Sequence, residues 1–272
     1  MKTSWALVGT CLLVLVHPTG TLRAQRQELE TLDSAVEVLQ AFGALSVKSI
    51  PPALLQDARG VAVIPNVVKA GFVLGGRFGR GVVLIRQADG TWGNPVFLTL
   101  AGGGIGWQAG VQSTDLVLVF KTSNGLDRIL RGQSKLTLGA DVGVAAGPVG
   151  REAAAATDGQ LKAEIYSYSR SRGLFAGLSV EGAGLLMDCE ANEALYQVRG
   201  GRPADVMALR GVPLPAQNLK VVLAKLSTPP APVVYPVAPV PALWPPVPPP
   251  PPPAVAPAGP PPPKWGPPGR DR

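Results

Sequence analysis

The sequence predicts an α+β fold, with a mainly antiparallel β-sheet core, an N-terminal helix, short connecting helices and a C-terminal helix. Two observations support this prediction. In the middle of the chain, short runs rich in valine, isoleucine and leucine are separated by Gly, Pro and Asn, which is the pattern of strands and turns. On either side of these runs, apolar residues recur at helical spacing, in Glu28–Leu45 and in Pro215–Leu226.

The first predicted helix, Glu28–Leu45, carries a stripe of apolar residues with acids on the opposite face. The stripe is Leu29, Leu32, Val36 and Leu39, and the acids are Glu28, Glu30, Asp33 and Glu37. Because anionic lipid would repel these carboxylates, we expect this helix to pack on the core. In Pro215–Leu226, Lys220 and Lys225 lie beside the apolar face, so that helix fits either a core lid or a membrane-surface helix.

The strands are expected to be short. The stretch Arg59–Arg86 predicts three, at Gly60–Ile64, Ala70–Gly75 and Gly81–Ile85. The same signals predict further strands at Val96–Ala101, Asp115–Phe120, Lys135–Ala146, Leu161–Tyr168 and Leu174–Leu186. Short helices are expected at Pro52–Asp57, at Leu126–Leu130 with Asn124 as its cap, and at Ala191–Val198. The glycines between Gly102 and Gly110 are one residue off a dinucleotide fingerprint, and we expect them to permit a tight turn or a close strand contact.

Both ends of the chain differ in composition from the middle. Residues 1–24 have a lysine at position 2, a short apolar run and small residues near Ala24, which is the layout of a secretory signal peptide. From Ser227 to Arg272 there are 21 prolines in 46 residues. Such a segment cannot form a core, so residues 228–272 are expected to be a disordered tail, either a spacer or a docking motif for a protein partner. One folded domain is left, at residues 25–227.

The histidine and cysteine content excludes several kinds of chemistry. The only histidine is His17, inside the predicted signal peptide, and after cleavage Cys189 is the only cysteine. A histidine-dependent nucleophile, a histidine-ligated metal and an intramolecular disulfide are therefore impossible in the mature chain. Asp115, Asp127, Asp141 and Glu181 show no spacing typical of a catalytic carboxylate pair. We expect no enzyme activity, no cofactor and no metal.

The stretch Arg59–Arg86 contains five basic residues and no acid. Arg77 and Arg80 lie among glycines at a predicted hairpin tip, where guanidinium and backbone N–H groups suit phosphate. A second basic turn is expected at Ser169–Gly173. These basic residues are candidates for binding an anion such as phosphate, and Phe78, between Arg77 and Arg80, is able to insert at a membrane interface. The alternative is a solvated basic hairpin with no ligand.

Four long segments of residues 58–196 follow one another in a specific order. They are ARGVAVIPNVVKAGFVLGGRFGRGVVLIR, WGNPVFLTLAGGGIGWQAGVQSTDLVLVF, KLTLGADVGVAAGPVGREAAAATD and KAEIYSYSRSRGLFAGLSVEGAGL. In these segments and their order, residues 58–196 resemble the SYLF domain family. The resemblance makes Lys69, Arg77, Phe78, Arg80, Arg86, Arg170 and Arg172 the candidate lipid-binding residues. It implies a single α+β domain that binds phospholipid, with phosphoinositides as ligands of eukaryotic members and actin binding for some fungal ones. Bacterial members are similar to exported envelope proteins. The acidic first helix departs from the amphipathic, membrane-binding helix of the family.

The resulting hypothesis is a non-catalytic domain that binds anionic phospholipid, in an exported protein of the periplasm or cell surface, peripherally attached to a membrane. The export signal removes nucleic acid and actin from the expected partners. A structural envelope protein, acting through oligomerisation and its proline-rich tail, is the alternative.

Overall fold

A computed structural model describes residues 19–44, 50–71, 74–105, 110–131, 135–148, 163–171, 174–176, 180, 182–228 and 259. The predicted tail lies almost entirely outside these ranges, as does most of the predicted signal peptide. Helix α1, Thr19–Gly43, begins before the predicted cleavage site at Ala24 and runs through it. Among the described helices, none has the length and apolar character needed to cross a bilayer.

Within the described residues, nine strands form one sheet in the order β5-β9-β3-β2-β1-β4-β7-β6, with β8 paired to β7. All pairs are antiparallel except β6 with β7. The strands are β1 Gly60–Gly71, β2 Leu74–Ile85, β3 Val96–Ile105, β4 Gly110–Phe120, β5 Leu136–Thr137, β6 Val144–Ala146, β7 Ile165–Ser171, β8 Leu174–Ala176 and β9 Gly184–Met187. The predicted antiparallel α+β architecture is confirmed.

The sheet is curled, because one short segment reaches both of its edges. Strand β5 pairs with β9 at one edge, and β6 pairs with β7 at the other. Residues 138–143 join β5 to β6, and six residues span at most about 21 Å. The single strand expected at Lys135–Ala146 is therefore wrong: the chain leaves one edge of the sheet and joins the other.

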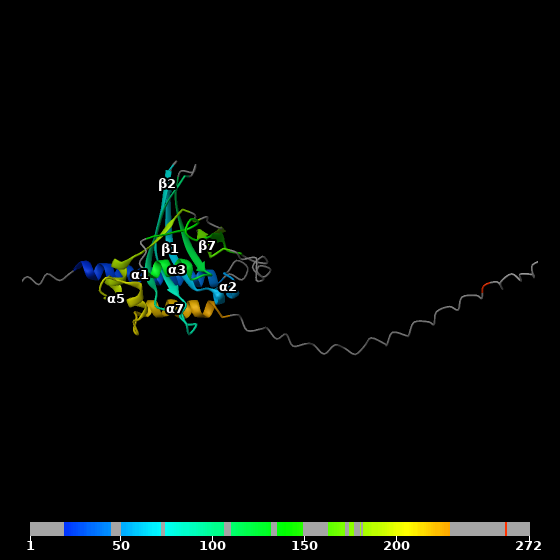
Figure 1. The fold of residues 1–272 in the computed structure, drawn as a ribbon. Helices are drawn as coiled ribbons and strands as arrows, with labels where there is room; N and C mark the ends of the chain where they lie inside the picture. The colour runs from blue at the N-terminus through cyan, green and yellow to red at the C-terminus, as the bar shows by residue number, and fades with distance from the viewer. Residues whose placement is uncertain are drawn as a thin grey trace, which may run out of the picture. The chain divides into compact units, whose positions relative to one another are not determined.

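The helices lie against the lower part of the central strands. They are α1, α2 Pro52–Asp57, α3 Asn124–Leu130, α5 Cys189–Tyr196, α6 Pro203–Met207 and α7 Leu214–Leu226. Helix α1 contacts α7, α5 and strands β1 and β2. Figure 1 shows α1 and α7 lying across the base of the sheet, while β1 and β2 rise away from them. Asn124 is the first residue of α3 rather than its cap, and Ser123 at the cap makes no side-chain bond.

The core joins the lower halves of the four central strands to the helices. Val61–Ile64, Val82–Leu84, Val96–Leu98 and Leu116–Phe120 are buried. Leu32, Leu39 and Phe42 of α1 and Leu219 and Leu223 of α7 belong to the same cluster. Removing this much apolar surface from water supplies the main favourable free energy of folding. Helix α7 is thus a core helix, one of the two roles that its periodicity allowed.

The buried face of α1 is rotated relative to the predicted stripe. Its buried residues include Glu28, Leu32, Ala35, Leu39 and Phe42, whereas Leu29 and Val36 are half-buried. Glu28 therefore lies on the core side of the helix, and the prediction that all four acids face away from the core is wrong for Glu28. The side chains of Glu30, Asp33 and Glu37 are exposed, as predicted.

The three strands predicted in Arg59–Arg86 are two long ones. Strand β1 runs through Pro65-Asn66 with a bulge, because Ile64 pairs with Leu116 and Val67 with Thr114. Asn66 adopts a left-handed conformation there, with φ of 49°, and its N–H donates to Oδ1 of Asp115. The Pro-Asn pair bends the strand without ending it.

The glycine cluster lies inside β2, so the prediction of a hairpin tip at Arg77 and Arg80 is wrong. A Cβ atom at Gly81 would lie 2.7 Å from Cα of Ile64, and one at Gly79 would lie 2.9 Å from the side chains of Ile64 and Val67. These glycines allow β2 to pass close to the bulge of β1. Gly102, in β3, likewise permits the close approach of Ala183, which confirms the expected close contact at that glycine run.

Candidate functional site

The ends of the four central strands beyond the bulge form a region that we call the projecting end. It consists of Val67–Gly71 of β1, Leu74–Gly79 of β2, Ala101–Ile105 of β3 and Gly110–Thr114 of β4. In Figure 1 the strands reach this end above the helical layer. The sequence of these four segments contains one lysine, one arginine and no acid. Side chains alternate between its two faces, so the register assigns each residue to a face.

One face of the projecting end is apolar and open to solvent. Val68 pairs with Phe78 and Ala70 pairs with Val111, which places these four side chains on the same face. Val68 is 42% exposed, Phe78 54% and Val111 77%. Single exposed apolar residues are common, but three on one sheet face form a patch.

The other face of the projecting end carries the two basic residues. Lys69 pairs with Arg77 across β1 and β2, and with Gln112 across β1 and β4. Lys69 is exposed and Arg77 is half-buried. Like charges placed directly opposite each other disfavour strand pairing. Of the predicted lipid-binding residues, the structure thus brings Lys69 and Arg77 together and places Phe78 on the reverse face.

A shallow groove of about 350 Å³ begins where the apolar face meets α1. Val68, Phe78 and Pro65 line it from the sheet, and Gln27 and Thr31 line it from the helix. Arg80 and Glu30 also line the groove. The groove continues the apolar face toward the body of the domain.

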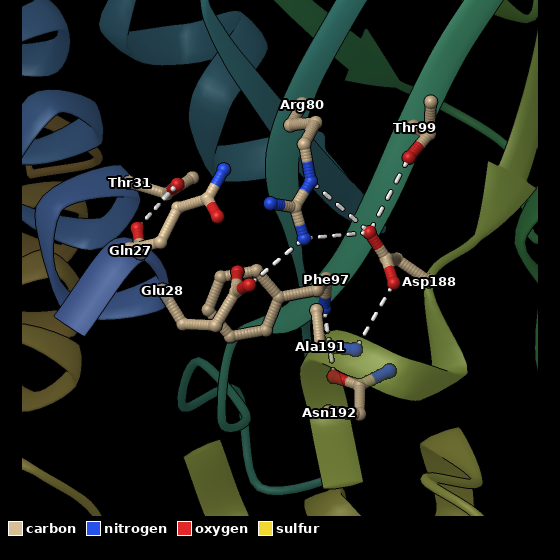
Figure 2. A network of polar contacts seen from close by, with 9 residues as sticks. All are labelled: Gln27, Glu28, Thr31, Arg80, Phe97, Thr99, Asp188, Ala191 and Asn192. Atoms are coloured by element: carbon tan, nitrogen blue, oxygen red, sulfur yellow. Dashed lines mark hydrogen bonds and ion pairs between the residues drawn. The ribbon is translucent and has the colours of Figure 1, made fainter. Parts of the chain in front are cut away.

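Arg80 is held by two carboxylates in the network of Figure 2. Its Nη2 donates to Oε1 of Glu28 at 2.8 Å and to Oδ2 of Asp188 at 2.9 Å, and its Nε donates to the same Oδ2 at 3.2 Å. Asp188 also caps α5, since its Oδ1 accepts from N–H of Ala191. One guanidinium thereby connects α1, β2 and the start of α5.

For both Glu28 and Arg80, burial shifts the pKa in one direction and the ion pair shifts it in the other. Burial raises the pKa of Glu28, and the hydrogen bond and charge of Arg80 only partly offset it. Desolvation acts to lower the pKa of Arg80, but the hydrogen bonds to Asp188 and Glu28 outweigh it, so that pKa is raised. Oε2 of Glu28 is buried without a hydrogen-bond partner among the described residues. The network leaves more negative than positive charge around Arg80, which does not favour an anion there.

Arg86 is also bonded inside the protein. Its Nε, Nη1 and Nη2 donate to the carbonyl oxygens of Ala58, Gly90 and Leu55 at 3.0, 2.8 and 2.8 Å. Its guanidinium lies 4.2 Å from the centre of the Trp92 ring, which adds a cation–π contact. Arg86 therefore fastens the end of β2 to α2 and to the turn before β3.

The second predicted basic turn contributes little to the projecting end. Arg170 lies on β7 directly opposite Asp115, so an acid is its nearest cross-strand neighbour. Arg172 lies outside the described residues. The sequence missed Glu28 and Asp188 as partners of Arg80. The helical spacing of Glu28, Leu32, Ala35 and Leu39 is the signal that could have placed Glu28 on the core side of α1.

Comparisons with known proteins point to one family. Residues 101–226 match the Ysc84 family model, described as "Las17-binding protein actin regulator". The protein YSC84 of Saccharomyces cerevisiae is 42% identical over 182 residues, which is 66% of this chain and 38% of the yeast protein. LAS seventeen-binding protein 3 of the same yeast is 41% identical over 181 residues, or 66% of this chain and 39% of that protein.

A vertebrate relative shows the same relationship. SH3 domain-containing YSC84-like protein 1 of Xenopus laevis is 37% identical over 167 residues, covering 60% of this chain and 49% of the frog protein. The chain thus spans about half or less of the length of these three relatives. The name of LAS seventeen-binding protein 3 and the description of the family model are those of binding proteins. These matches confirm the resemblance of this region to the Ysc84/SYLF domain family.

Proposed function

We propose that the domain is a non-catalytic binding module that attaches to anionic phospholipid through its projecting end. The observation that carries this proposal is the combination found there: an exposed apolar face with Val68, Phe78 and Val111, a reverse face with Lys69 and Arg77, and no acid on any of the four strand ends. A membrane interface accepts both groups at once, because apolar side chains enter it and basic ones pair with lipid phosphate.

The geometry favours an end-on approach. Because the apolar and basic side chains are on opposite faces, the sheet cannot lie flat on a bilayer and use both. Entering with the strand ends first places both faces in the headgroup layer, where the long side chains of Lys69 and Arg77 extend toward phosphate. Each basic residue near an anionic surface contributes about 1 kcal/mol. Two such residues and one inserted aromatic give weak, reversible attachment.

In this proposal, fewer of the seven predicted lipid-binding residues contact the lipid. Lys69, Arg77 and Phe78 contact lipid directly. Arg80 and Arg86 hold the base of the strands that carry them, through Glu28, Asp188 and the carbonyl groups near α2. Arg170 supports attraction at longer range. We also propose, from residues 1–24, that the protein is exported to the periplasm or cell surface.

The test is co-sedimentation of the full-length protein with neutral and anionic vesicles at low and high salt. Binding is expected for anionic vesicles only, and it should disappear at 1 M salt, where screening acts over about 3 Å. Lys69→Glu/Arg77→Glu and, separately, Phe78→Ser should each abolish it. Lys225→Glu/Arg210→Glu is the matched control, because it reverses the same charge at exposed positions outside the projecting end. Equal binding of the two double variants would overturn the proposed site.

A protein partner is the second candidate, favoured by the family description, which names Las17 binding and actin regulation. The same exposed apolar face would suit a protein surface. Sedimentation with actin filaments, using wild type and Phe78→Ser, separates the two. Binding to filaments but not to vesicles would replace the lipid proposal. Deleting residues 228–272 should leave vesicle binding unchanged if the lipid proposal is right, and should abolish partner capture if the structural alternative is right.

A further inference from the structure

A second pocket lies between the turn after β2 and helix α7. Its volume is about 620 Å³, which is in the range of small-molecule sites. Arg86 and Trp92 line it from the side of the sheet. Lys220 and Val221 line it from the helix, and Ser227 and Thr228 line it where the helix ends.

Both basic residues of this pocket have hydrogen-bonding capacity left. Lys220 Nζ donates to Oδ1 of Asn94 at 3.1 Å, and an ammonium group has three N–H donors. Arg86 uses three of its five N–H groups on backbone carbonyls. Neither is in an ion pair with an acid of the described chain. Two cations in one pocket without a carboxylate between them favour a bound anion.

No described residue lining the pocket is acidic. Two acids lie outside this lining: Asp89, whose Oδ1 accepts both N–H and Oγ1–H of Thr91, and Asp57, whose charge acts on Arg86. The last carbonyls of α7 would repel an anion, yet those of Leu223 and Ala224 accept the hydroxyls of Ser227 and Thr228. Burial is the largest cause that lowers the pKa of Arg86; the charge of Arg59 lowers it further, and the charge of Asp57 raises it.

We propose that this pocket binds a phosphomonoester carried on a small organic body. A phosphomonoester brings close to two negative charges at neutral pH, which matches the two cations, and its oxygens suit both a guanidinium and an ammonium group. The volume exceeds what an inorganic phosphate ion fills, so an attached body such as glycerol has room beside Val221. The group can come from a soluble metabolite or from a lipid headgroup.

This site goes beyond the proposed membrane attachment and is separate from it. Arg86 follows the last residue of β2, whereas the projecting end includes its first residue, Leu74. A strand of 12 residues is about 40 Å long. Variants of one site therefore leave the other intact, and the two proposals can fail independently.

The experiment is calorimetric titration of the full-length protein with glycerol 3-phosphate, with glycerol as the neutral control. Saturable binding is expected for glycerol 3-phosphate and not for glycerol. Lys220→Gln, which keeps a donor for Asn94, should weaken it about tenfold, as expected for one lost charged bond. Val221→Asp should abolish it, because Val221 is 66% exposed and an acid there places a negative charge in the pocket without disturbing the core.

Matched controls lie on the same helix. Lys225→Gln removes the same charge outside the pocket, and Leu214→Asp adds the same charge at an exposed position in the first turn. Both should bind glycerol 3-phosphate as wild type does, and so should Lys69→Glu/Arg77→Glu. The protein could instead bind vesicles with phosphatidic acid but not glycerol 3-phosphate. If Lys220→Gln but not Lys225→Gln then weakens vesicle binding, the phosphomonoester comes from a lipid. Equal binding by Lys220→Gln and Lys225→Gln for both probes overturns the proposal.

Discussion

Arg80 donates from Nη2 to Oε1 of Glu28 at 2.8 Å, across 52 residues of sequence. Glu28 is 3% exposed and Arg80 25% exposed, so the pair lies at the edge of the core where α1 meets β2. The bond holds the N-terminal helix against the strand whose far end projects from the domain. Exposed ion pairs contribute little to stability, but removing one partner of a buried pair leaves the other charge unsolvated.

Arg80→Ala should therefore destabilise the domain strongly. We expect the free energy of unfolding to fall by about 3 kcal/mol, because the buried carboxylate of Glu28 loses its cation. Glu28→Gln in the same background should restore most of this loss, since no buried charge then remains at that position. Urea unfolding of the wild type, both single variants and the double variant gives the coupling energy. Additive effects would mean that the two side chains do not interact.

The pH dependence of Glu28→Gln tests the same pair from the other partner. Burial raises the pKa of Glu28 above 4.5, so the folded protein holds this proton more tightly than the unfolded chain does. Its contribution to stability is thus fully present below about pH 4.5 and is lost as the pH rises through the raised pKa. Arg80 and Asp188 are the charged groups that act on it.

Glu28→Gln removes the loss of stability that accompanies deprotonation of Glu28. Its free energy of unfolding should rise relative to that of the wild type between about pH 4 and pH 7, as measured by urea unfolding at several pH values. Glu30→Gln is the control, because Glu30 is an exposed acid on the same helix, in an i,i+4 pair with Arg26. A difference that falls with pH would show that the attraction of Arg80 exceeds the cost of burial.

Gly81→Ala tests the close passage of β2 beside the bulge of β1. A Cβ atom at Gly81 would meet the backbone of Val63 and Ile64, which cannot move without breaking the strand pairing. We expect a loss of about 3 kcal/mol in the free energy of unfolding, as for other overpacked sites. Gly76→Ala is the matched control in the same strand, since its Cβ would meet nothing closer than 4.0 Å. Equal effects of the two substitutions would contradict the close contact between β2 and the bulge.

The features that the sequence predicted well are those specified by neighbouring residues. Helix α2 has the predicted bounds, Pro52–Asp57, because a proline in the first turn and two leucines specify it locally. Helix α7 differs from its prediction by one residue. The cores of the central strands were found because β-branched runs are local signals, and the antiparallel α+β class followed from them. The single strand predicted at Leu174–Leu186 is wrong, because β8 ends at Ala176 and β9 begins at Gly184.

The features that the sequence did not predict depend on distant contacts. Glycines at Gly79 and Gly81 predicted a turn, but the reason for them is the bulge on the neighbouring strand. Arg80 was predicted as an open anion-binding group, whereas one of its acids lies 108 residues away, at Asp188. The basic character of the stretch was evident from composition, but the division of Lys69 and Phe78 between two faces required the register.

Arg86→Lys separates a structural role from a lipid-binding one. Lysine keeps the charge but cannot donate to the carbonyl groups of Ala58, Gly90 and Leu55 together, and it loses the planar stacking on Trp92. Each lost hydrogen bond costs about 1 kcal/mol, so the free energy of unfolding should fall by about 2 kcal/mol. Arg59→Lys, at an exposed position just before β1, should change it by less than about 0.5 kcal/mol.

Vesicle binding measured on the same variant completes the test. At a temperature where Arg86→Lys is still folded, its binding to anionic vesicles should equal that of the wild type, because Arg86 lies at the opposite end of β2 from Lys69 and Arg77. Unchanged stability together with lost vesicle binding would assign Arg86 to the lipid site, as the sequence predicted. The expected result assigns it to the support of strand β2.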